Sequence, residues 1–151
     1  MKTLTFLSAL LFVCSGCDSS KSTFEPEKQN YETLVIHYEA NTRGFYQKLV
    51  VQNHTISSTN DRKGIKTPIV QKISDADWNL LLSEFNKVDL EGLPNLKAPT
   101  NKRSYDGAAI AGLKISFKGK TFETTSFDHG TPPMELQKIV EIVNTLFKAE
   151  E

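Results

Sequence analysis

The chain has 151 residues, of which 38% are apolar and 24% are charged, and its 18 Lys and Arg residues balance 18 Asp and Glu residues. This apolar fraction without net charge excludes an intrinsically disordered protein, and the balanced charge gives no overall field that would attract nucleic acid. Two cysteines are too few for a disulfide scaffold, so the composition predicts one small globular domain.

Residues 1–16 have the layout of a secretory signal peptide. Lys2 gives a positive start, residues 4–13 form an apolar run, and the small residues Ser15 and Gly16 follow. The run is about ten residues long, whereas a transmembrane helix needs roughly 20. We therefore expect residues 1–16 to be a cleavable signal peptide and not a transmembrane helix.

The sequence Cys14-Ser15-Gly16-Cys17 resembles a bacterial lipobox. The resemblance implies that Cys17 is lipidated and becomes the first mature residue, so that the protein would be held on a membrane by its acyl chains. Residues 17–30 are polar and predict a flexible tether, and residues 31–151 predict a single globular domain. The expected location is the bacterial cell envelope, either periplasmic or surface-exposed.

The first half of the domain predicts four short strands and a helix. β-branched and aromatic residues predict strands at 33–38, 45–51, 55–59 and 68–73, and their links are too short for parallel crossovers. Apolar residues then follow helical spacing over 75–87, after a Ser74 that suits a helix N-cap. The long segment 88–106 predicts a loop that is either functional or contains a short element.

The second half predicts a hairpin and a final helix. Strands at 108–117 and 121–127 flank Lys118-Gly119, a two-residue turn signal, and an apolar stripe predicts a helix over 133–148. The fold class is therefore α+β: a single antiparallel sheet of about five or six strands, in the order ββββαββα, with two helices packed on one face.

No familiar catalytic or nucleotide-binding motif occurs in the sequence, and this includes the P-loop, the dinucleotide-binding glycine motif and the nucleophile elbow. The three histidines, His37, His54 and His129, are not at metal-ligand spacing. We therefore expect neither a metal site nor a cofactor.

Asp128-His129, just before the final helix, is the most suggestive pair. The carboxylate could orient the imidazole for general-base catalysis, or Asp128 could close a turn and leave His129 exposed. The catalytic interpretation predicts a cleft in which His129 faces Arg103 or Asp106.

Two loop segments carry residues suited to recognition. Arg43 and Tyr46 lie at the first turn, and Arg103, Tyr105 and Asp106 lie in the long loop. Arg binds carboxylates or phosphates through its forked donors, and Tyr offers a rigid contact with a polar tip. The alternative is that an internal Arg–Asp pair fastens the loop to the sheet.

With its lipobox-like start, its TRGFY turn, its SDADW helix start and its FDHGTPP segment, the chain resembles the small lipoproteins of unknown function common in the Bacteroidota. That resemblance implies a secreted α+β domain and no particular activity. We therefore expect a lipid-anchored, non-catalytic binding or interaction module with a protein or small-molecule partner in the envelope. The alternatives are an envelope hydrolase that uses Asp128 and His129, and a small inhibitor of an exported enzyme.

Overall fold

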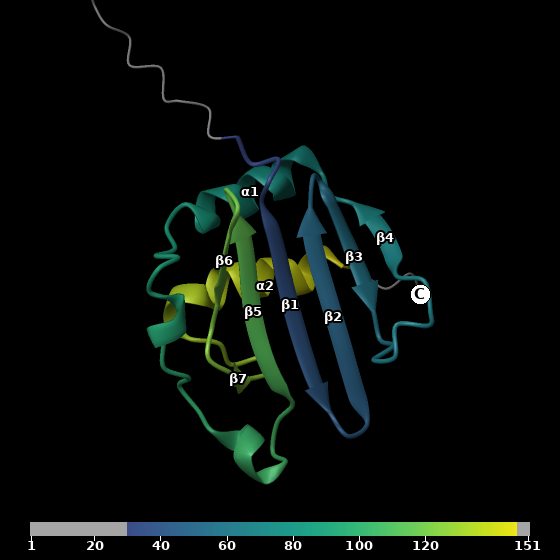
Figure 1. The fold of residues 1–151 in the computed structure, drawn as a ribbon, viewed down its shortest axis with the longest axis vertical. Coiled ribbons are helices and arrows are strands. Elements are labelled where there is room, and N and C mark those ends of the chain that lie inside the picture. The colour runs from purple at the N-terminus through teal and green to yellow at the C-terminus, as the bar shows by residue number, and fades with distance from the viewer. Residues whose placement is uncertain (1–29, 148–151) are drawn as a thin grey trace, which may run out of the picture.

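A computed structural model describes residues 30–147. The expected signal peptide, Cys17 and almost all of the expected tether lie outside these residues. The described part is an α+β domain in which helices pack on an antiparallel sheet, which confirms the expected fold class (Figure 1).

The sheet consists of seven strands in the order β4-β3-β2-β1-β5-β6, with β7 also paired to β5. The strands are β1 (Val35–Thr42), β2 (Phe45–Gln52), β3 (Thr55–Thr59), β4 (Ile69–Lys72), β5 (Ile110–Phe117), β6 (Lys120–Glu123) and β7 (Phe127–Asp128). Every pairing in it is antiparallel. The central strand β1 is longer than the sequence predicts, because it has a partner strand on both sides as far as Asn41.

Tight turns connect neighbouring strands. Asn53 and His54 join β2 to β3, and Lys118 and Gly119 join β5 to β6, with positive φ at all four residues. Two successive residues of positive φ form the turn whose twist matches that of a hairpin. The expected turn at Lys118-Gly119 is therefore confirmed.

The helices α1 (Asp75–Phe85) and α2 (Gln137–Leu146) lie on one side of the sheet, with α2 crossing behind its strands in Figure 1. The Ser74 side chain accepts a hydrogen bond from the Asp77 N–H at 3.1 Å, as the capping pattern predicts. α2 starts later than expected, because a short 3₁₀ turn, η3 (Met134–Leu136), precedes it.

The core lies between the helices and one face of the sheet. Alternate residues of β1, β2 and β5 are buried on that face, among them Tyr38, Leu49 and Leu113, and α2 adds Ile139 and Val143. The opposite face, which we call the open face, is turned toward the viewer in Figure 1, where α2 lies behind the strands.

The returning strand after β5 is interrupted, and this corrects the single strand predicted over 121–127. Lys114 pairs with Glu123, but Ala111 pairs with Phe127 where a continuous register would place Ser126. One extra residue is therefore inserted, which defines a β-bulge. The bulge moves Phe127 to the core face, where it is fully buried, and it raises the strand count to seven.

Candidate binding site

Asp128 fastens the long loop to the sheet. Its buried carboxylate accepts hydrogen bonds from the Thr100 hydroxyl at 2.6 Å and from the backbone N–H groups of Lys102 and Arg103 at 2.7 and 3.0 Å. The Arg103 guanidinium lies 3.1 Å from the same carboxylate. These contacts hold the 3₁₀ turn η2 (Lys102–Tyr105) against β7, which is the internal Arg–Asp pair that the sequence offered as one interpretation.

The hydrogen bonds determine the ionisation of Asp128. Burial by itself would raise the pKa of this carboxyl, but the donors from Thr100, Arg103 and Lys102 outweigh burial and hold the pKa well below its usual range. Asp128 is therefore a carboxylate at neutral pH, and the donors surrounding it already occupy its oxygens.

His129 bonds to Tyr38 and not to Asp128. The Tyr38 hydroxyl lies 2.8 Å from Nδ1 of His129 and also receives hydrogen bonds from the Gly130 backbone and the Asn144 side chain. Burial raises the pKa of Tyr38 to about 12 and lowers the pKa of His129. Tyr38 therefore keeps its proton at neutral pH, and its hydrogen bond joins a neutral phenol to an imidazole whose charged form is disfavoured.

His129 lines a hollow of about 410 Å³ between the 129–132 turn and α2. Its walls include Pro132 and Val140, and neither Arg103 nor Asp106 lines it. His37 and His54 lie elsewhere, on β1 and in the β2–β3 turn. The His54 ring stacks on the Trp78 ring, with their centroids 4.6 Å apart.

The first turn, the long loop and the Asp128-His129 turn lie near one another at one end of the sheet, but they do not together line the hollow beside His129. The Phe45 ring lies 5.3 Å from His129, and Arg103 contacts Asp128, so the segments are neighbours. Arg43 and Tyr105 are exposed, and Asp106 ends η2 in the left-handed conformation.

Tyr46 lies on the open face of the sheet, beside Glu39. The Tyr46 hydroxyl bonds to the Glu39 side chain, and the Arg62 guanidinium covers its ring at 5.7 Å. Burial and the Glu39 carboxylate raise the pKa of Tyr46. The Tyr46 hydroxyl therefore stays protonated and donates a hydrogen bond to Glu39.

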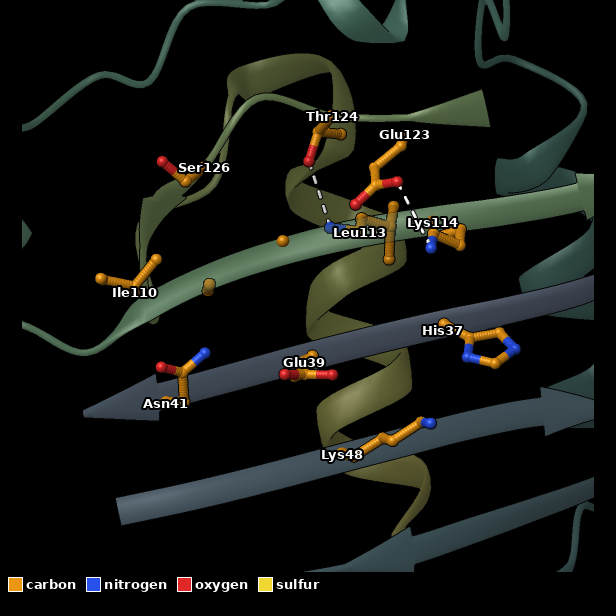
Figure 2. A pocket seen from close by; sticks show the side chains of 12 residues that line it. His37, Glu39, Asn41, Lys48, Ile110, Leu113, Lys114, Glu123, Thr124 and Ser126 are labelled. Atoms are coloured by element: carbon orange, nitrogen blue, oxygen red, sulfur yellow. Dashed lines mark hydrogen bonds and ion pairs between the residues drawn. The ribbon is translucent and has the colours of Figure 1, made fainter. Parts of the chain in front are cut away.

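The open face contains a hollow of about 440 Å³ around Gly112, which we call the Gly112 hollow. This volume falls in the range of roughly 300–1,000 Å³ typical of small-molecule sites. Figure 2 shows its side chains rising from β1, β2, β5 and the β6–β7 segment. They belong to His37, Glu39, Asn41, Lys48, Ile110, Lys114, Glu123, Thr124 and Ser126.

The hollow lies over Gly112 because this residue has no side chain to fill it. It pairs with Glu39 of β1 in the middle of the sheet, where residues 110 and 114 on the same face have full side chains. Its φ is not in the left-handed region, and a Cβ atom there would meet nothing within 4 Å outside the adjacent residues. Neither the backbone nor the packing requires glycine at this position.

The bulge forms the edge wall of the hollow. The Thr124 hydroxyl accepts the N–H of Leu113 at 3.1 Å, where an uninterrupted ladder would use a carbonyl, and the Thr124 N–H bonds to the Leu113 carbonyl at 3.0 Å. The chain then departs from β5 and rejoins it at Phe127, so that Thr124 and Ser126 border the hollow.

The charged side chains of the hollow are balanced. Lys48 and Lys114 face Glu39 and Glu123, and Lys114 lies 3.3 Å from Glu123. Burial, together with Lys48 and Lys114, lowers the pKa of His37 against an opposing effect of Glu39. His37 is therefore neutral at pH 7, and the hollow offers both signs of charge with no net excess.

None of the residues expected to take part in recognition lines this hollow, although Tyr46 bonds to Glu39, which does. The predicted first strand ended at residue 38, which left Glu39 outside it and assigned Asn41 to the following turn, and Gly112 was one glycine within the predicted strand 108–117. The available signal was the alternation of polar residues at 37, 39 and 41, which continues the strand period.

Among residues 30–147 no group of three or more His, Cys, Asp or Glu side chains is arranged to hold a metal ion. No helix within these residues has the length and apolar character needed to cross a bilayer. Comparison with protein families, curated proteins and solved structures finds no significant match to this chain.

Proposed function

We propose that this protein is a non-catalytic binding module of the bacterial cell envelope, anchored by lipid at Cys17, and that its ligand site is the Gly112 hollow. The observation that carries the proposal is the glycine itself. Glycine in the interior of a strand costs about 0.5–1 kcal/mol relative to alanine, and here neither torsion nor crowding requires it. Space for a ligand is a physical reason for that cost.

The surroundings of Gly112 support a binding role. Two lysines, two glutamates, an asparagine and a serine converge on one concave surface from strands that the core holds rigid. Small-molecule sites are concave, and convergent polar groups in them fix the orientation of the ligand. By contrast, Asp128 and Arg103 are bonded to each other and to the loop that they hold.

A photo-crosslinking experiment in the native host tests the proposal. A benzophenone amino acid replaces Ile110, which lies on the rim of the hollow with 44% of its surface exposed, and the matched control replaces Leu80 of α1, which is 50% exposed. We expect a discrete adduct mass at position 110 and none at position 80.

Gly112→Val provides the decisive variant. The valine fills the hollow without a clash and suits a strand, so the free energy of unfolding in urea should rise by about 0.5–1 kcal/mol while the adduct disappears. Equal labelling at positions 80 and 110, or an adduct that persists in a stably folded Gly112→Val variant, would refute the proposed site.

A further inference from the structure

Two opposite charges flank Gly112 on the open face. Glu39 lies directly across from it on β1, and Lys114 lies two residues along β5, so both side chains project from the same face. Diagonal neighbours of this kind lie roughly 7–8 Å apart, and their Cβ atoms are somewhat closer. The Glu39 carboxylate and the Lys114 ammonium therefore border the same part of the hollow, next to Gly112.

Each charge is held in place from the side away from Gly112. The Tyr46 hydroxyl bonds to Glu39, and Arg62 in turn covers the Tyr46 ring. Glu123 holds Lys114 at 3.3 Å from the edge strand β6. Because a carboxylate accepts several hydrogen bonds and an ammonium donates three, both groups retain capacity for a ligand.

The remaining walls restrict the ligand further. The formal charges of Glu39, Glu123, Lys48 and Lys114 cancel, and His37 is neutral, so neither a simple anion nor a simple cation complements the hollow. Ile110 supplies an exposed apolar wall at the end of the hollow beyond Gly112.

We infer that the Gly112 hollow binds a small zwitterion of the α-amino-acid class with an aliphatic side chain. The ligand ammonium bonds to Glu39, its carboxylate bonds to Lys114, and its side chain packs on Ile110. Tyr46 is a positioning residue that orients the Glu39 carboxylate. This inference rests on the proposed function, since it names the ligand of the same hollow.

Amide chemical shifts of the ¹⁵N-labelled domain at low salt provide the test, with leucine as the probe. Leucinamide, which lacks the carboxylate, N-acetylleucine, which lacks the ammonium, and glucose serve as comparison probes. We expect leucine to shift the Gly112 amide saturably, and each comparison probe to bind at least about tenfold more weakly, as the loss of one charged hydrogen bond predicts.

Variants of Glu39 and Lys114 test the contribution of each charge to leucine binding. Glu39→Gln and Lys114→Gln should each weaken leucine binding by about tenfold, and Tyr46→Phe should weaken it less while the fold is retained. Lys138→Gln is the matched control, because it breaks a similar exposed lysine–glutamate pair on α2, at 3.0 Å from Glu141, and should leave binding unchanged.

Several outcomes would overturn the inference. Equal binding of N-acetylleucine would indicate an anion site, and a preference for glucose would indicate a polyol site. No shift of Gly112 with leucine would also reject a zwitterion. In each case crosslinking through position 110 remains an independent measurement, so rejection of the ligand class is distinguishable from rejection of the site.

Discussion

Asp128 illustrates how one side chain can organise a loop. Its carboxylate receives donors from Thr100, Lys102 and Arg103, and these contacts close a segment that has no regular strand or helix beyond short 3₁₀ turns. A charge so fully hydrogen-bonded stabilises the fold only while it remains ionised.

Replacement of Asp128 by Asn should therefore lower the melting temperature by roughly 10 °C, because the amide NH₂ would face the donors of the loop. Thermal unfolding followed by circular dichroism measures this effect. Asp106→Asn removes the same charge at the exposed end of η2, where Asn tolerates the left-handed backbone, and it should change little. Similar melting temperatures for the two variants would contradict the anchoring role.

The pH dependence has a definite direction. The fold lowers the pKa of Asp128 below its ordinary value of 3.8, so its contribution to stability is complete above that pH and is lost as the pH falls further. The wild-type protein should lose stability below about pH 4, and Asp128→Asn should lose less over the same interval.

At the scale of elements, the β-bulge between β6 and β7 decides which residues reach the core. The extra residue allows Phe122 and Phe127 to pack on the same side, although their odd spacing would place them on opposite faces of a regular strand. The Thr124 hydroxyl stabilises the bulge because it accepts the buried N–H of Leu113.

Thr124→Val tests this contact, because valine has the same shape without the hydroxyl. We expect a loss of about 1–3 kcal/mol in the free energy of unfolding, since the Leu113 N–H would be left without its acceptor. Urea denaturation measures the change. Thr121→Val on β6, where the hydroxyl shares a solvent-exposed hydrogen bond with Ser116, is the control and should be close to neutral. A loss in the control as large as that of Thr124→Val would attribute the effect to the strand and not to the bulge.

At the scale of the whole molecule, the domain begins at one end of the sheet, and the Gly112 hollow extends toward the other. The Tyr31 ring stacks on Phe117, and Thr33 accepts the N–H of Lys118 in the β5–β6 turn. Asn41 and Ile110, on the rim of the hollow, lie at the other end of the sheet, where β1 ends and β5 begins. The proposed lipid at Cys17 would join the domain at the first end, and the hollow lies toward the end away from that attachment.

Cys17→Ser tests the anchor. We expect the wild-type protein in the membrane fraction of its host, with an acylated N-terminal peptide, and the variant in the soluble fraction. Fractionation and mass spectrometry of that peptide give the result, with Cys14→Ser as the control that should remain in the membrane. Membrane retention of Cys17→Ser, or an unmodified Cys17 in the wild-type protein, would refute the anchoring proposal.

The sequence by itself determined the elements whose cause is local. Alternation predicted most of the strands, helical spacing predicted α1 with its Ser74 cap, and Lys118-Gly119 predicted a hairpin turn, because each of these patterns depends on residues close together in the chain. It also singled out Asp128 and Arg103 and offered an internal Arg–Asp pair between the loop and the sheet, but the structure identified the two partners.

Only the tertiary structure decided the register across strands. Whether Ala111 pairs with Ser126 or with Phe127 depends on packing between segments far apart in sequence, and that choice created the bulge. The same pairing placed Gly112 across from Glu39 and brought polar side chains from separate strands around one hollow. No local pattern contains this information, because it is the contact between strands that selects the register.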